Sequence, residues 1–115
     1  SQNYRTKQNC ITYSFLGDVF YHPYTISVDM KIHIIIPQKL VLNKYIGLFI
    51  VHCLKKLSIN LSYGNQMSMN DLKQKRITLP KFPNGSPDWE YMEQYVVNIF
   101  NKIKFSQLMP IIEKI

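Results

Sequence analysis

Long apolar runs and paired cysteines are both missing from this sequence of 115 residues. No apolar run approaches the roughly twenty residues of a membrane-spanning helix, and no charged and then apolar leader opens the chain. We therefore expect a cytoplasmic protein without a membrane partner. The two cysteines, Cys10 and Cys53, lie far apart and outside the paired spacings of zinc and redox sites. The sequence predicts that both are small core residues and that the protein holds no metal or other cofactor.

Acidic residues are scarce, with 7 Asp and Glu against 14 Lys and Arg, so the formal net charge is +7. The first 87 residues hold three of the acids, Asp18, Asp29 and Asp71, together with most of the basic residues. The excess positive charge therefore belongs to the body of the protein. Such charge attracts polyanions through counterion release and favours nucleic acid over a small neutral substrate. Many basic proteins bind no nucleic acid, so composition by itself leaves the partner open.

Most of the strand-forming part of the sequence lies in its first third. A chain of this length with 46% apolar residues can bury one modest core, and we expect a single domain over residues 1–115. Residues 1–10 are polar and without periodicity, which predicts a flexible start. Four β-prone runs follow: Ile11–Phe15, Val19–Tyr21 up to the turn at His22-Pro23, Thr25–Val28 and Ile32–Ile36. The first two predict a hairpin around Gly17-Asp18, and the very apolar fourth run predicts a central strand.

Two later segments have helical periodicity. Asn43 suits the N-cap of a first helix whose apolar residues recur at spacings of three and four: Ile46, Phe49, Ile50, Cys53, Leu54 and Leu57. Three lysines lie off this stripe and predict a basic, solvent-facing back: Lys44, Lys55 and Lys56. The C-terminal helix region is expected at 86–109, with Ser86 as N-cap and Pro87 as first helical residue. The sequence thus predicts an α+β fold, a small twisted β-sheet body with one covering helix and a C-terminal helix.

The order of several motifs resembles one protein family. The segments are Gly17–Tyr24, Ser27–Asp29, Leu42–Ile50, Leu61–Gly64, Leu72–Pro80 and Asn84–Glu93. Together they resemble the target recognition domain of restriction-modification systems, as found in type I specificity subunits and in type IIG or BcgI-like enzymes. The resemblance covers about Gly17 to Phe100, and Leu79-Pro80 followed by Gly85–Glu93 is its most specific part. Family members have a longer β-rich half before the first segment, so the chain is expected to correspond to the C-terminal half of such a domain.

The resemblance implies a division of labour. The domain would select a sequence in double-stranded DNA, and separate DNA methyltransferase and endonuclease subunits would carry out the chemistry. The sequence agrees with this division. It has no Asn/Asp-Pro-Pro-Tyr/Phe loop with a glycine-rich turn, as an amino-methyltransferase requires, and it lacks the spaced acids and lysine of a common nuclease core. Pro87-Asp88 is interpreted as a helix start. We therefore expect a specificity module without catalytic residues, cofactor or metal.

Transferred to this chain, the resemblance predicts DNA contacts from loops of the β-rich body. Nine residues are candidates: Tyr21, His22 and Tyr24 in the first loop, Tyr63, Asn65 and Gln66 in the second, and Lys73, Lys75 and Arg76 before a strand at Ile77. Amides can bond adenine, basic residues can bond guanine or phosphate, and aromatic rings can stack on an extruded base. Each candidate also has a simpler interpretation, as a half-buried sheet-edge aromatic, a turn residue or a solvated charge. His33 and His52 are expected to be structural, since no third ligand lies at metal spacing.

Two other functions stay open at this point. The chain can be an interaction element, one part of a split domain that binds DNA only after complementation by another chain or by a second copy. It can also be an enzyme in its own right, although no catalytic constellation is found in the sequence.

Overall fold

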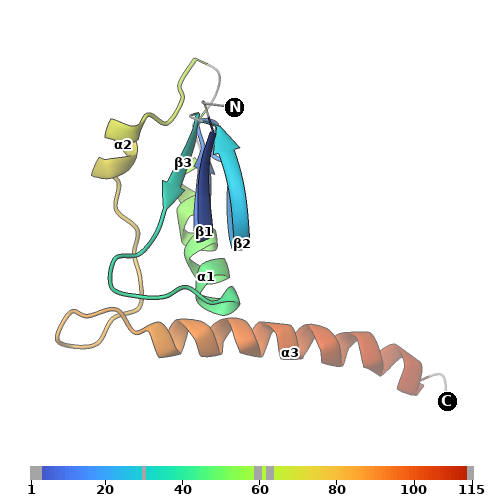
Figure 1. Cartoon of the computed structure of the whole chain (residues 1–115). Helices are drawn as coiled ribbons and strands as arrows, with labels where there is room; N and C mark the ends of the chain where they lie inside the picture. The colour runs from blue at the N-terminus through green and yellow to red at the C-terminus, as the bar shows by residue number, and fades with distance from the viewer. Residues whose placement is uncertain (1–3, 30, 59–60, 62–63, 114–115) are drawn as a thin grey trace.

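The computed structural model describes residues 4–29, 31–58, 61 and 64–113 (Figure 1). Three strands come first, then two helices that flank a 3₁₀ turn, and last a long helix. In chain order they are β1 (Tyr4–Ser14), β2 (Val19–Asp29), β3 (Ile32–Ile35), α1 (Lys44–Lys55), the 3₁₀ turn η1 (Lys56–Ser58), α2 (Met69–Gln74) and α3 (Trp89–Glu113). The predicted α+β class is confirmed. No helix of the described part of the chain has the length and apolar character needed to cross a membrane.

The three strands form one antiparallel sheet in the order β2-β1-β3. Tyr13 of β1 stands opposite both Val19 of β2 and His33 of β3, so β1 is the central strand. The predicted hairpin around Gly17-Asp18 is confirmed. The prediction that Ile32–Ile36 is central is wrong, because among the described residues this short strand pairs with β1 along one edge only, and Pro37 ends its run.

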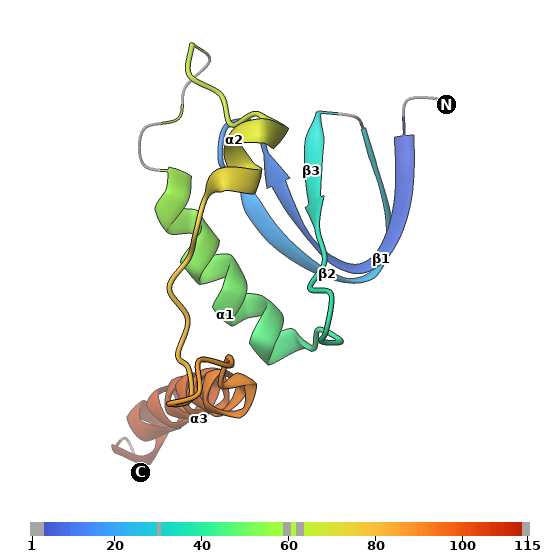
Figure 2. The same cartoon turned by 90° about the vertical axis from the view of Figure 1, so that its left-hand side faces the viewer.

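The flexible start predicted for residues 1–10 needs correction, because Tyr4–Cys10 is the first half of β1 and pairs with the second half of β2. The turn predicted at Pro23 is also wrong. The ladder continues through a bulge, where Asn9, with φ 52°, alone faces Pro23 and Tyr24. A bulge tolerates proline because the ladder hydrogen bond is already interrupted there. The hairpin bends at this point into the U that Figure 2 shows.

The core lies between the sheet and α1. It contains Ile11, Tyr13 and Val19 from the sheet, Leu42 before the helix, Ile46, Ile50, Val51 and Leu54 from α1, and Met67 from the following loop. The predicted N-cap is confirmed, since Asn43 Oδ1 accepts hydrogen bonds from the backbone N–H groups of Tyr45 and Ile46 at 3.0 and 2.9 Å. Gly47 permits close contact, because a Cβ there would lie 2.7 Å from the Tyr21 ring. The predicted covering helix therefore packs as expected.

The last helix starts later than predicted. Its first turn is capped by Asp88, whose Oδ1 accepts from the Tyr91 N–H at 3.0 Å, while the Ser86 hydroxyl donates to Asn84 Oδ1 at 2.7 Å. A carboxylate at this place also complements the helix dipole. α3 crosses below α1 and continues beyond the body (Figure 1). It extends past Pro110, where we expected it to stop.

Between these helices, the strand predicted at Ile77 is also absent from the structure. Residues 75–80 have no regular secondary structure, and α2 precedes them. A capping box begins α2: the Ser68 hydroxyl accepts from the Asp71 N–H at 3.0 Å, and Asp71 Oδ2 accepts from the Ser68 N–H at 3.4 Å. This reciprocal pair gives a helix of only six residues a defined start.

The hairpin turn depends on a glycine. Gly17 has φ +93°, and a Cβ there would lie 2.5 Å from Ser58 Cβ. We expect Gly17→Ala to lower the free energy of unfolding by about 2 kcal/mol or more, since backbone strain and a clash add together. Gly85→Ala, with φ +91° and open space, should cost about 1 kcal/mol. Gly64→Ala, with open space, should change it by less than about 0.5 kcal/mol. Urea unfolding of the three variants tests this order, and equal losses would contradict it.

Candidate nucleic-acid interface

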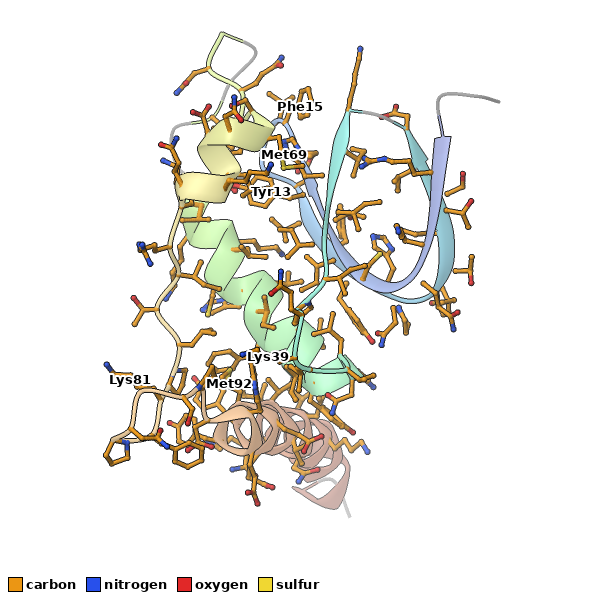
Figure 3. All side chains as sticks on the ribbon, turned by 60° about the vertical axis from the view of Figure 1, so that its left-hand side comes forward. Tyr13, Phe15, Lys39, Met69, Lys81 and Met92 are labelled. Carbon is orange, nitrogen blue, oxygen red and sulfur yellow. The ribbon has the colours of Figure 1, made fainter. Side chains whose placement is uncertain are left out.

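The loop at residues 64–68 is held against the sheet by Met67. This side chain is 2% exposed and belongs to the core. Its N–H donates to the Phe15 carbonyl at 2.8 Å, and its own carbonyl accepts from His33 Nε2 at 2.7 Å. The rings of Phe15 and His33 lie 4.9 Å apart. His33 is thus a satisfied core histidine, as predicted. Figure 3 shows Phe15, Tyr13 and Met69 at this end of the sheet, far from Lys39 and Lys81.

The residues just before Met67 line a polar pocket of about 500 Å³. Its polar lining comes from four elements of the chain: Lys56 of η1, Asn65 and Gln66 of the loop, Asp71 of α2 and Lys75 directly after α2. We call these five residues the polar pocket. Three of the nine predicted DNA contacts, Asn65, Gln66 and Lys75, therefore meet at one place. Lys56 joins them although the sequence only assigned it to the basic back of a helix.

Local structure explains why these side chains meet. Lys56 directly follows α1, where η1 turns the chain toward the hairpin, and Ser58 fixes that turn by donating to the Gly17 carbonyl at 3.0 Å. Lys75 ends α2, and its N–H donates to the Leu72 carbonyl at 3.1 Å. The Asp71 carboxylate accepts from the Ser68 N–H, so it serves the start of α2. The pocket therefore gathers two lysines, two amides and one carboxylate. The lysines suit phosphate contacts, and the amides suit contacts with base edges.

Three further candidates are Lys73, Arg76 and Tyr63, of which Lys73 and Arg76 do not line this pocket. Lys73 and Lys75 line a neighbouring apolar pocket of about 340 Å³ between β3, α1 and α2. Arg76 is exposed in the segment that follows. Tyr63 lies outside the described residues. The charge run after α2 is therefore solvent-facing, which agrees both with phosphate contact and with a solvated surface.

The candidates of the first predicted loop sit in β2 and are separated from the polar pocket. Tyr21 faces α1, and its hydroxyl donates to Asn9 Oδ1 at 2.5 Å. Burial, and to a lesser degree Cys10, raises the pKa of Tyr21. Its structure matches the simpler interpretation of a half-buried sheet aromatic. Tyr24 is 71% exposed beside the bulge, so its DNA contact stays a prediction.

His22 is half-buried on the other face of β2, where Thr12 Oγ1 lies 2.8 Å from its Nε2. Burial lowers the pKa of His22 from its ordinary value of 6.5. The surroundings therefore disfavour the imidazolium form in the folded state.

This shift predicts a pH-dependent stability. Below about pH 6.5 the unfolded chain takes up a proton at His22 more readily than the folded chain, so the free energy of unfolding should fall as the pH decreases from about 7 to about 5. His22→Gln should flatten that dependence. Urea unfolding at several pH values measures it. The same pH slope in wild type and His22→Gln would contradict the assignment.

No metal centre is formed by the described residues, since no three His, Cys, Asp or Glu side chains gather there. Cys10 and Cys53 are both buried, as expected for core residues, and burial raises the pKa of each thiol. Cys53 Sγ lies 3.9 Å from the Thr78 carbonyl, which its thiol contacts. His52 is exposed on α1, and its expected structural role stays a prediction.

Fold and pocket together define a small α+β domain with a cationic, amide-bearing loop surface and a projecting C-terminal helix. Residues 1–106 match the family model of the type I restriction modification DNA specificity domain, and the chain belongs to this family. It is also 29% identical over 98 residues to the specificity subunit S.BcgI of a type II restriction enzyme from Heyndrickxia coagulans. That alignment covers 83% of this chain and 29% of the relative, so the chain spans less than a third of that subunit's length. No solved structure matches.

Family membership confirms the predicted resemblance to target recognition domains. The description of this family names a DNA specificity domain of type I restriction-modification systems.

Proposed function

We propose that the polar pocket is the DNA-binding site of this specificity domain. Lys56 and Lys75 would hold phosphates of a double-stranded DNA, while Asn65 and Gln66 bond base edges in a groove. The observation that carries this proposal is the meeting of two lysines and two amides on one exposed surface, where a single carboxylate, Asp71, leaves a positive balance. The exposed Lys73 and Arg76 extend the same cationic surface along the chain.

The chemistry of the system would belong to other subunits. The domain would bind a chosen DNA sequence and hold the duplex in place for its partners. A partner DNA methyltransferase would then flip and modify a base of that duplex, and an endonuclease of the same system would cut unmodified DNA. The domain is not itself an enzyme in this proposal. The family description, a specificity domain, supports this division.

α3 offers a contact surface for such a partner. Its buried residues Met92 and Val96 face the body. Large apolar side chains follow one another at a spacing of four along its exposed surface: Tyr91, Tyr95, Ile99 and Ile103, between 42% and 54% exposed. The Tyr95 ring also packs edge-on against Phe49 of α1, at 5.8 Å, so this residue contacts the body, and Ile99 and Ile103 form the distal end of the row.

Replacing two phosphate-binding lysines should change the salt dependence of DNA binding. Each phosphate contact contributes about 0.9 to the slope of log affinity against log salt, so Lys56→Gln with Lys75→Gln should reduce that slope by about 2. A matched control is Lys39→Gln with Lys81→Gln, which removes the same charge from exposed sites at the opposite end of the molecule (Figure 3). Filter binding of a random duplex across a salt series measures both slopes. Equal slopes in the two double variants would contradict the proposal that the polar pocket binds the DNA.

The distal row of α3 can be tested separately. Ile99→Ser with Ile103→Ser should weaken co-purification with the methyltransferase subunit of the same system by about tenfold or more, because apolar anchors dominate such contacts. Asn98→Ser with Asn101→Ser changes exposed polar residues of the same helix and should leave the complex intact. Equal retention of the partner by both variants would contradict this role for α3.

One observation favours complementation as a second candidate function. Among the described residues no strand pairs with the outer edge of β3, and Ile36 just beyond it is 46% exposed beside the apolar pocket. A strand from another chain of the same system, or from a second copy, would satisfy that edge. If the chain binds duplex only after such a chain is added in the filter assay, complementation is supported. Unaided binding by a monomer, established by light scattering, excludes it.

A further inference from the structure

We propose that His33 is a positioning residue for DNA specificity. From the core, it holds the backbone of Met67 so that the exposed side chain of Gln66 meets an adenine edge. This inference rests on the proposed function, because it concerns how the polar pocket selects a base.

The backbone at Met67 is fixed from three directions. Its side chain lies in the core, its N–H donates to the Phe15 carbonyl, and its carbonyl accepts from His33 Nε2 at 2.7 Å. A carbonyl only accepts, so Nε2 carries the proton in this contact. Gln66 is the preceding residue, and consecutive Cα atoms are about 3.8 Å apart. The placement of Met67 therefore limits where the backbone of Gln66 can lie.

Gln66 lies at the junction of three pockets. On one side is the polar pocket with Lys56 and Lys75. On another, a pocket of about 350 Å³ is lined by Phe15 and His33 themselves, together with Arg5. These neighbours make Gln66 the point where the core contacts meet the cationic surface.

The third pocket sets the direction of the duplex. It carries Asp18 and Asp29 with Lys31 as the cation, so it repels phosphates more than the polar pocket does. The DNA backbone is thus favoured on the side of Lys56 and Lys75, and the amide of Gln66 then faces base edges next to it. A Gln amide can bond N6 and N7 of adenine together.

Such a two-point contact requires an accurately placed backbone, because a shift of about an ångström removes one of the two bonds. His33 is 4% exposed and takes no part in binding DNA directly. Without its hydrogen bond, the Met67 carbonyl loses a buried partner, and the loop can move away from its place at the sheet. Loss of His33 should therefore act on base selection through Gln66.

The test uses the full chain and a randomised duplex library, with sequencing of the bound DNA. Wild type should enrich adenine at one position. Gln66→Ala should lower that enrichment on the order of tenfold, with the salt slope on random duplex unchanged. Gln66→Glu should move the preference toward cytosine, whose N4 donates to a carboxylate. Gln38→Glu, an exposed control in the segment before α1, should keep adenine.

The His33 variants separate positioning from general stability. His33→Leu should lose the same adenine enrichment, and adding Gln66→Ala to it should cause no further loss, since both changes remove one contact. His33→Gln can still donate to Met67 and should restore the preference. His33→Asn is shorter and should not, which keeps the test decisive if His33→Leu fails to fold. His52→Leu is the matched control at an exposed histidine.

Three results would overturn the inference. The first is that Gln66→Ala keeps the adenine preference. The second is that His33→Leu or His33→Asn loses base preference at positions of the duplex where Gln66→Ala does not, and the third is that a folded His33→Gln variant does not restore the adenine preference. A wild-type chain that binds no duplex would instead remove the proposed function, and the inference with it. Binding without the predicted selection would remove the inference alone.

Discussion

The candidate site depends on the contact of Met67 with the hairpin turn and with β3. Its two backbone hydrogen bonds and its buried side chain join the loop at 64–68 to the sheet. A polar loop without such an anchor would have no fixed position relative to α1 and α2. Because Met67 makes these contacts inside the core, the preceding Asn65 and Gln66 remain exposed while the backbone of the loop is held against the sheet. The core contacts of Met67 thus position the loop that lines the polar pocket.

The bent hairpin has a second consequence for the arrangement of the site. The bulge at Asn9 and Pro23 lets two strands of eleven residues fold back on themselves, so the sheet closes partly around β3 (Figure 2). The turn at Gly17 then lies next to η1, where the Ser58 hydroxyl contacts both the Gly17 carbonyl and the Tyr13 hydroxyl. This brings the end of α1, and with it Lys56, to the same end of the sheet as the anchored loop.

α3 belongs to a different part of the molecule. It crosses the start of α1 at the end away from the polar pocket, where the Asn43 amide donates to Glu93 Oε1 at 2.8 Å and Lys44 Nζ lies 4.8 Å from the Phe100 ring (Figure 1). A site for DNA at one end and a helix for a partner at the other would keep the two contacts from competing. Under the proposed function, this separation would let the domain hold DNA and a partner subunit at the same time.

The sequence by itself determined what depends on neighbouring residues. The cap at Asn43, the apolar face of α1, the hairpin around Gly17 and the family resemblance all rest on local spacing and residue type, and the structure or the comparisons confirmed them. Tertiary structure decided the rest. A local pattern ended the strand at Pro23 and made Ile32–Ile36 central, but strand order and the bulge depend on which partner each strand finds. The polar pocket likewise brings Lys56, Gln66 and Lys75 together because the loop at 64–68 is hydrogen-bonded to a sheet that is distant in sequence. No local sequence pattern predicts such a long-range contact.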